Sequence, residues 1–328
     1  LLLGYPVAFT LGGVSLIFGL ATFGLDFFSL LPLRIWGVMT NYVLLAVPLF
    51  IYMGVMLEKS GLADDLLETM ALLFGRMRGG LAISVIIVGA LLAATTGIVG
   101  ATVVTMGLLS LPTMLRRGYS PELTTGTIAA AGTLGQIIPP SIVLVLLGSI
   151  LNVPIGDLFA GAFIPGIGLV LIYLLWIAII SWLKPGAAPA MPAAELDRFQ
   201  GRHMAKRVLL AFLLPVALMI AVLGSIFFGI ASPTEAAAVG ALGATILTLF
   251  YKKLSYKTLA AVMRETTFLT SMVFIILVGA TAFGLVFRGM HGDRYLTELI
   301  INSNLSPQAF LALVMVVVFI AGFFIDFI

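Results

Sequence analysis

The sequence lacks cysteine altogether and contains little histidine and little charge. Because cysteine is absent from all 328 residues, disulfide bonds, thiolate nucleophiles and cysteine-based metal sites are excluded. His203 and His291 lie in separate polar stretches, and neither has a second metal ligand beside it in the sequence. The formal net charge of +3 is too small to indicate a nucleic-acid partner.

Catalytic motifs are missing as well. The sequence contains no HExxH, GxSxG, Walker A or Cys/His cluster. The serine–histidine pair or aspartate pair of an intramembrane protease cannot be assembled either. We therefore expect a protein that is not an enzyme and that needs no cofactor.

Apolar residues dominate what is present. Hydrophobic residues make up 61% of the chain and charged residues 9%, and the mean hydropathy is +1.21. This composition predicts an all-α polytopic membrane protein. The sequence starts without methionine inside one apolar run and stops inside another, so we expect it to be truncated at both ends.

Residues 79–115 form an uncharged run of 37 residues with two arginines shortly before it and two directly after it. One bilayer crossing takes about 20 apolar residues, so this run is short for two crossings and a turn. We favour a re-entrant hairpin at 79–116, with two half-helices that meet at a tip at residues 95–100. The alternative is one long tilted helix with a glycine-rich packing face.

The predicted tip has the chemistry of an ion or substrate site. Helix ends at membrane depth expose carbonyl groups that suit a sodium ion and N–H groups that suit a carboxylate. The candidate binding residues are Thr95, Thr96, Gly97, Gly100 and Thr102. The alternative is that the threonine hydroxyls bond back to their own helix backbone.

A second interruption follows in the uncharged helix predicted at 122–148. Pro139 and Pro140 remove two backbone donors, so the helix must break there and leave carbonyl groups unpaired. The candidate binding residues of this break are Gly135, Gln136, Pro139, Pro140 and Ser141. The alternative is a proline kink that neighbouring helices satisfy.

Residues 184–207 carry five basic residues and form the main linker, which separates 1–183 from 208–328. The positive-inside rule places this linker and the basic loops expected at 58–80, 116–117 and 252–264 in the cytoplasm, and 288–306 outside. An amphipathic helix within 58–75 is expected to lie along the interface.

Elements recur at an offset of about 225–230 residues. A proline-initiated span near Pro6 corresponds to one at Pro233, and Thr96 corresponds to Asp326. Because five predicted crossings separate the two starts, the repeats are inverted, which is typical of secondary transporters. The second repeat, 208–328, is then incomplete and ends at the tip of a second hairpin.

Two carboxylates near helix ends need separate interpretations. Asp326 follows a long apolar run, and a carboxylate at the bilayer centre costs about 3 kcal/mol, so we predict that it is an ion ligand. The alternative places Asp326 in water at the end of a plain span. Glu235 is expected to close a capping box with Ser232 instead of binding an ion.

Four segments resemble one protein family. They are GYPVAFTLG, VPLFIYMGVMLEKSGLADDLL, the run from TTGIVGATVVTMG to LGQIIPPSIVLVLLG, and ASPTEAAAVGALGA. In this order they resemble the large membrane subunit, a DctM-like permease, of tripartite ATP-independent periplasmic (TRAP) transporters. The resemblance covers nearly the whole chain.

The resemblance implies a multi-pass permease of the bacterial inner membrane that imports an organic acid with sodium as the coupling ion. It implies an elevator mechanism and two partners, a small membrane subunit and a periplasmic substrate-binding protein. Sodium would be held by Thr95, Thr96 and Asp326. The nearest alternative is a sodium/carboxylate symporter that needs no binding protein, and a channel is a third interpretation.

Overall fold

The computed structural model describes residues 5–96, 99–192, 208–303 and 305–323. Within these ranges the regular structure is entirely helical, which confirms an all-α protein. Five of the described helices are long and apolar enough to cross a membrane. They are Tyr42–Lys59, Ile155–Leu183, Val208–Phe227, Pro233–Phe250 and Tyr256–Gly289.

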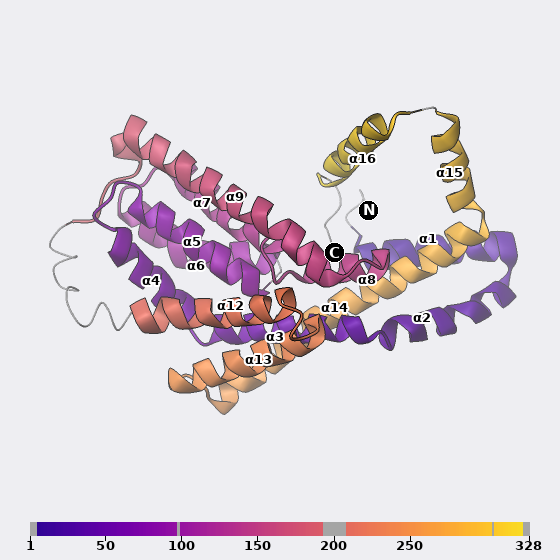
Figure 1. The fold of residues 1–328 in the computed structure, drawn as a ribbon, viewed down its shortest axis with the longest axis horizontal. Helices are drawn as coiled ribbons and strands as arrows, with labels where there is room; N and C mark the ends of the chain where they lie inside the picture. The colour runs from indigo at the N-terminus through magenta and orange to yellow at the C-terminus, as the bar shows by residue number, and fades with distance from the viewer. Residues whose placement is uncertain (1–4, 97–98, 193–207, 304, 324–328) are drawn as a thin grey trace. The chain divides into compact units, whose positions relative to one another are not determined.

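The chain packs as two units, residues 42–267 and residues 1–41 with 268–328. The larger unit (Figure 1) contains η2 (Tyr42–Leu45), α3 (Ala46–Lys59), α4 (Leu62–Phe74), α5 (Gly80–Thr96), α6 (Val99–Arg116), α7 (Pro121–Thr133), η3 (Leu134–Gln136), α8 (Ile142–Leu151), α9 (Ile155–Leu183), η4 (Pro185–Ala187), η6 (Val208–Leu213), α12 (Leu214–Phe227) and α13 (Pro233–Phe250). The smaller unit contains α1 (Val7–Phe23), η1 (Leu25–Leu30), α2 (Leu31–Met39), α15 (Gly292–Asn302) and α16 (Pro307–Ala321). Helix α14 (Tyr256–Gly289) contributes to both units.

Three helices start as the sequence predicts, with serine at the N-cap and proline after it. The Ser120, Ser232 and Ser306 hydroxyls each accept a hydrogen bond from the backbone N–H three residues later, at 3.3 Å. At Ser232 the Glu235 carboxylate also accepts from the Ser232 N–H at 2.8 Å. The capping-box interpretation of Glu235 is confirmed.

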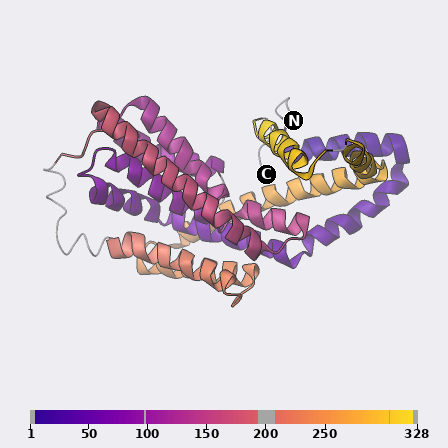
Figure 2. The same ribbon diagram turned by 45° about the horizontal axis from the view of Figure 1, so that its top comes forward.

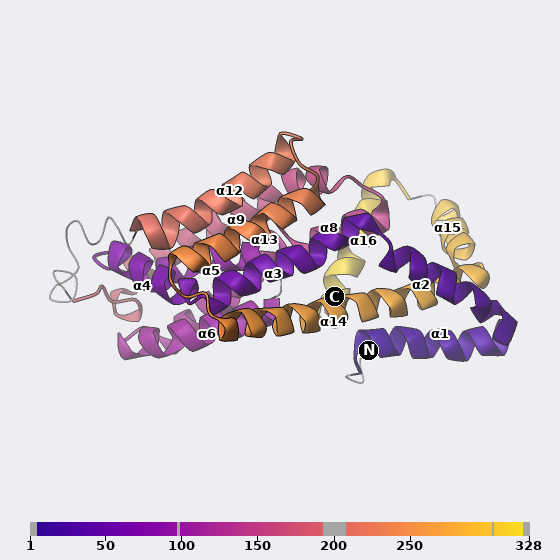
Figure 3. The same cartoon turned by 90° about the horizontal axis from the view of Figure 1, so that it is seen from below.

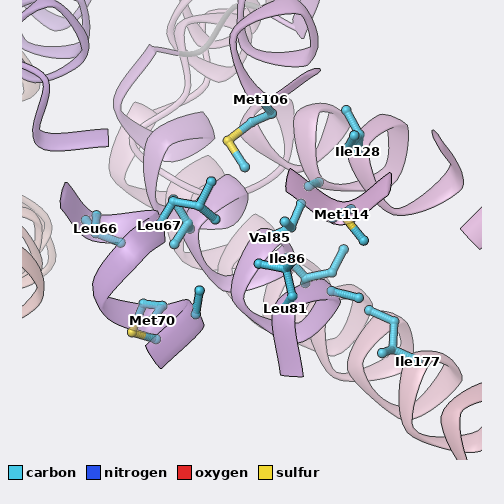
Figure 4. Close-up of a cluster of buried hydrophobic side chains, with 14 of the residues drawn as sticks. Leu66, Leu67, Met70, Leu81, Val85, Ile86, Met106, Met114, Ile128 and Ile177 are labelled. Atoms are coloured by element: carbon cyan, nitrogen blue, oxygen red, sulfur yellow. The ribbon is translucent and has the colours of Figure 1, made fainter. Parts of the chain in front are cut away.

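Helix α5 lies at the centre of the larger unit and packs against α3, α4, α6, α7 and α9. Its residues Leu81, Val85 and Ile86 are buried among apolar side chains of these neighbours (Figure 4). A helix that is apolar on all sides belongs in such a position, because every face meets another helix. The first arm of the predicted hairpin is therefore the core of this unit.

Helices α3 and α13 form another close pair in the same unit (Figure 3). Gly240 of α13 makes room for the side chains of Met53 of α3 and Val222 of α12, which pack directly against its backbone. The Tyr52 and Thr245 hydroxyls hydrogen-bond across the interface at 3.0 Å. Small residues and hydroxyl pairs of this kind are the usual contacts between membrane helices.

Helix α4 differs in part from the interfacial helix expected within residues 58–75. Helix α3 continues to Lys59, the chain turns at Gly61 in the left-handed region (φ +68°), and α4 starts at Leu62. The apolar face of α4, with Leu66, Leu67 and Met70, is buried in the core of the larger unit. Its amphipathic pattern therefore reflects protein packing as well as any contact with the interface.

The basic segment at 252–264 is also mostly helical, where a loop was expected. Helix α14 begins at Tyr256, and the loop is restricted to the residues before it. Lysine and arginine favour helices nearly as well as alanine, so charge marks the end of the apolar core but not the end of the helix.

The start of the predicted linker packs against other segments of the larger unit, to which it belongs. The Ala188 carbonyl accepts from Gly79 N–H and the Ala187 carbonyl accepts from Ser120 N–H, both at 3.0 Å, and Met191 N–H donates to the Gly75 carbonyl at 2.8 Å. Residues 184–192, the strap, therefore join the end of α9 to the turns before α5 and before α7. The rest of the linker, 193–207, lies outside the described residues.

Candidate functional site

The predicted hairpin at 79–116 consists of two helices, α5 and α6, that pack against each other. They have 17 and 18 residues, which corresponds to about 26 and 27 Å at 1.5 Å per residue. Each arm is thus longer than half of the about 30 Å hydrocarbon core. The half-helices expected from the sequence are nearly full-length helices, and the depth of the tip depends on their inclination.

The tip itself is only partly described. Thr95 and Thr96 end α5 and Gly100 is in the first turn of α6, but their side-chain surroundings lie outside the described part. Gly97 and Asp326 lie outside the described residues altogether. The Thr102 side chain is buried, with 3% of its surface exposed.

The second predicted interruption is present as a break between α7 and α8. Helix α7 ends at Thr133, η3 follows, and α8 begins at Ile142. Pro139 and Pro140 are buried and have no N–H to donate to the carbonyls of Gly135 and Gln136, four residues earlier. The helix therefore stops where the two adjacent prolines predict.

Ser141 bridges this break. Its side chain is fully buried, and its hydroxyl donates to the Gln136 carbonyl at 2.7 Å. On the near side of the break, the N–H groups of Ile137 and Ile138 donate to the Leu134 carbonyl at 3.1 and 3.0 Å. The hydroxyl replaces the backbone donor that proline removes, while its oxygen lone pairs stay available as acceptors.

The structure brings this break and the arms of the hairpin together. The segment η3, which contains Gly135 and Gln136, packs against both α5 and α6. In Figures 1 and 2, α7 runs beside α5 and α6 in the same bundle. Gly132 of α7 approaches the backbone of Val103, so the candidate residues of the break adjoin the arm that carries Thr102. Two groups separated by about 40 positions in the sequence become neighbours.

Glu58 is a polar contact of the hairpin that the sequence did not reveal. Its carboxylate, 14% exposed, accepts a hydrogen bond from the Thr105 hydroxyl of α6 at 3.0 Å. The neighbouring Lys59 pairs with Glu265 of α14 at 2.9 Å. The only signal in the sequence was the polar run Glu-Lys-Ser-Gly at the end of α3. The partner of Glu58 lies on α6, far along the chain, so this run could not reveal it.

The chemistry of the described residues favours hydroxyl and carbonyl oxygens over a carboxylate cluster. Among them no group of three histidine, cysteine, aspartate or glutamate side chains is placed to hold a metal ion. Backbone carbonyls at the 137–141 break and threonine and serine hydroxyls remain, which are hard oxygen donors of the kind that alkali cations take. The described residues of the break and of α6 thus supply oxygen donors without a carboxylate cluster.

Comparison with known proteins gives the family. The family described as "Tripartite ATP-independent periplasmic transporter, DctM component" matches residues 1–328. The C4-dicarboxylate TRAP transporter large permease protein DctM of Pseudomonas aeruginosa is 33% identical over 96% of this chain and 72% of its own length. The sialic acid TRAP transporter large permease protein SiaM of Vibrio cholerae is 30% identical over 98% of this chain and 74% of its own length.

A third relative is the isethionate TRAP transporter permease protein DctMQ of Oleidesulfovibrio alaskensis. It is 30% identical over 99% of this chain, which covers 50% of that protein. The match extends over the complete sequence, including both arms of the hairpin and the α7–α8 break. The chain therefore belongs to the DctM family, the large membrane subunits of TRAP transporters, and is a multi-pass membrane protein.

Proposed function

We propose that this chain is the permease of a sodium-coupled TRAP system that imports an organic acid across the bacterial inner membrane. The observation that supports this most directly is the α7–α8 break packed against both hairpin arms. Broken helices that present carbonyls and N–H groups beside each other are how secondary transporters hold a cation and an anionic substrate together.

The proposed sodium ligands are the hydroxyls of Thr95 and Thr96 at the first tip and the Asp326 carboxylate at the second. Thr102 on α6 and Gly135, Gln136 and Ser141 in the break beside the hairpin arms would contact the ion or the substrate carboxylate. Gly97 and Gly100 would let the backbone approach the ion or the substrate closely, and Pro139 and Pro140 would keep the helix broken. No catalytic step and no cofactor other than the coupling ion enters this proposal.

The proposed partners are a periplasmic substrate-binding protein and a small membrane subunit. The relatives are named for C4-dicarboxylates, sialic acid and isethionate, all of which are organic acids. The relative named DctMQ is twice as long as the aligned part, which supports a second membrane subunit beside the one represented here. An elevator movement, in which a transport domain built from the hairpins and the broken helices moves against a scaffold, is part of the proposal.

Inverted repeats are supported by the order of elements and by two pairs of residues with left-handed backbone at corresponding positions. Helix α1 is followed by Gly24 (φ +75°), and α13 is followed by Lys252 (φ +56°), 228 positions later. Gly61 (φ +68°) precedes α4, and His291 (φ +58°) precedes α15, 230 positions later. The first repeat then contains α1, α3, α4 and α5 in order. The corresponding helices of the second repeat are α13, α14, α15 and α16.

Uptake into proteoliposomes tests the function. The full-length permease with its small subunit would be reconstituted, and radiolabelled C4-dicarboxylate and sialic acid would be supplied with or without a sodium gradient and the cognate binding protein. We expect saturable uptake that needs both. Uptake with sodium but without the binding protein would show a stand-alone symporter instead, and uptake indifferent to sodium would remove the coupling proposal.

The Asp326→Asn variant tests the second tip. We expect it to abolish sodium-dependent uptake, because the amide keeps the size of the side chain but removes the charge that offsets the cation. The control is Asp293→Asn, which removes an exposed carboxylate in the first turn of α15. Unchanged sodium dependence of uptake in a folded Asp326→Asn protein would disprove the assignment.

A further inference from the structure

A groove lies between α7 and α9. It has a volume of about 500 Å³, within the range of about 300–1,000 Å³ that small-molecule sites occupy. One wall is α7 with Gly126 and Ala130, the other is α9 with Tyr173 and Trp176, and Ile86 of α5 is part of the floor. None of these residues belongs to the candidate transport site.

The groove runs along both helices. Its lining extends from Ser120 to Ala130 on α7 and from Tyr173 to Lys184 on α9, about 15 Å at 1.5 Å per residue. An unbranched hydrocarbon chain fits a groove of this length and volume, and the two charged side chains at its end indicate which kind of hydrocarbon-bearing molecule it takes.

Two opposite charges stand at one end of the groove. Glu122 is in the first turn of α7 and Lys184 directly follows α9, and both side chains are exposed and line the groove. The remaining lining is mostly apolar or aromatic, with Trp176 59% exposed. Basic residues cluster at this end of the unit, and the positive-inside rule places it at the cytoplasmic headgroup level.

We propose that this groove binds one glycerophospholipid whose headgroup carries both a phosphate and a primary amine. One acyl chain lies between α7 and α9, the Lys184 ammonium contacts the lipid phosphate, and the Glu122 carboxylate contacts the lipid amine. A lipid of this charge pattern satisfies both side chains, whereas a purely anionic headgroup leaves Glu122 facing a like charge.

Gly126 makes the proposal testable without disturbing the packing of the protein. A Cβ built at Gly126 meets no heavy atom within 4 Å, so Gly126→Leu fills the groove and no protein contact is lost. Leucine also favours the helix more than glycine does. Gly161→Leu on α9 is the matched control, because its Cβ is equally free and it does not line the groove.

The experiment is native mass spectrometry of the full-length permease titrated with palmitoyl-oleoyl phosphatidylethanolamine or with phosphatidylglycerol of the same chains. We expect the wild type and Gly161→Leu to bind one phosphatidylethanolamine in preference to phosphatidylglycerol. Gly126→Leu should lower phosphatidylethanolamine affinity at least tenfold. Glu122→Gln should keep binding but reduce the preference between the two lipids.

Three results would overturn the proposal. One is unchanged lipid affinity in Gly126→Leu, and another is equal binding of both lipids by the wild type. The third is a Gly126→Leu protein that binds lipid normally but no longer copurifies with the small membrane subunit, since the occupant would then be a partner helix. None of these readouts depends on sodium-coupled uptake, so the lipid site is tested independently of the transport proposal.

Discussion

At the residue scale, single glycines set how closely the hairpin and the broken helix approach. A Cβ on Gly132 would lie 2.8 Å from the Cα atom of Val103, and backbone cannot yield as a flexible side chain does. Gly126, on the same helix, has open space at the same point. Two glycines six positions apart in α7 therefore serve different purposes.

We expect Gly132→Ala to destabilise the protein by about 1–3 kcal/mol, since α6 and α7 must separate to admit the methyl group. Gly126→Ala should be neutral or slightly stabilising, because alanine restricts the unfolded chain. Thermal unfolding in detergent measures both. Equal melting temperatures for the two variants would contradict the close approach of α6 and α7.

Also at the residue scale, two left-handed glycines flank the strap. Gly79 (φ +77°) and Gly118 (φ +79°) carry the same backbone penalty for a side chain. A Cβ on Gly79 would overlap the Ser181 hydroxyl and lie 3.1 Å from Ile177, whereas one on Gly118 meets Pro189 at 3.7 Å, an ordinary contact.

Gly118→Ala is expected to cost about 1–2 kcal/mol of unfolding free energy from the left-handed backbone alone. Gly79→Ala should cost more, because the steric overlap with α9 adds to the same backbone term. The difference between the two midpoints in a denaturant series isolates the packing of the turn against α9. A Gly79→Ala protein no less stable than Gly118→Ala would refute this packing.

At the element scale, polar contacts fasten the hairpin and α4 to their neighbours. The Glu58–Thr105 hydrogen bond joins α3 to α6 in a mostly buried position. The Lys253–Asp65 pair joins the loop before α14 to α4 at 3.0 Å, but its side chains are 41% and 45% exposed. Burial makes the first contact the stronger one, because water and salt screen the second.

Removing the Thr105 hydroxyl should lower the unfolding free energy by about 1.5–3 kcal/mol, as expected when a mostly buried charged group loses a hydrogen-bond donor. Thr105→Val keeps the shape of the side chain, and Glu58→Gln completes a double-mutant cycle. Asp65→Asn is the comparison and should cost at most about 1 kcal/mol, less at high salt. Additive effects of Thr105→Val and Glu58→Gln would show that the two side chains do not interact.

At the scale of the whole molecule, the two left-handed turns at Gly61 and His291 precede corresponding helices of the proposed repeats. If the repeats are inverted, the turns that follow these helices lie on opposite sides of the membrane. Arg76 follows α4 and Asn302 ends α15, and both are exposed. Because none of these 328 residues is a cysteine, a single introduced cysteine among them is the one that a thiol reagent labels.

We expect Arg76→Cys and Asn302→Cys to react from opposite faces. In intact spheroplasts a membrane-impermeant maleimide should label Asn302→Cys, and it should label Arg76→Cys only after permeabilisation, because the positive-inside rule places the basic segment in the cytoplasm. The unsubstituted protein is the blank, since none of these 328 residues is a cysteine. Labelling of both positions from one face would exclude inverted repeats.

The sequence by itself determined the helical class, the membrane location, the serine-proline helix starts and the break at Pro139-Pro140. These are local: caps, missing donors and runs of apolar residues act within a few positions of the residues concerned. Motif resemblance along the whole chain also indicated the family, which the comparisons confirm.

Only the tertiary structure decided that the break adjoins the hairpin arms, that Glu58 meets Thr105, that residues 184–192 form a strap and that a groove remains between α7 and α9. Each of these depends on residues tens of positions apart, whose pairing follows from shape complementarity among many apolar helices. A sequence in which most faces are apolar does not reveal which face meets which neighbour, because periodicity distinguishes partners only where polar residues mark the solvent side.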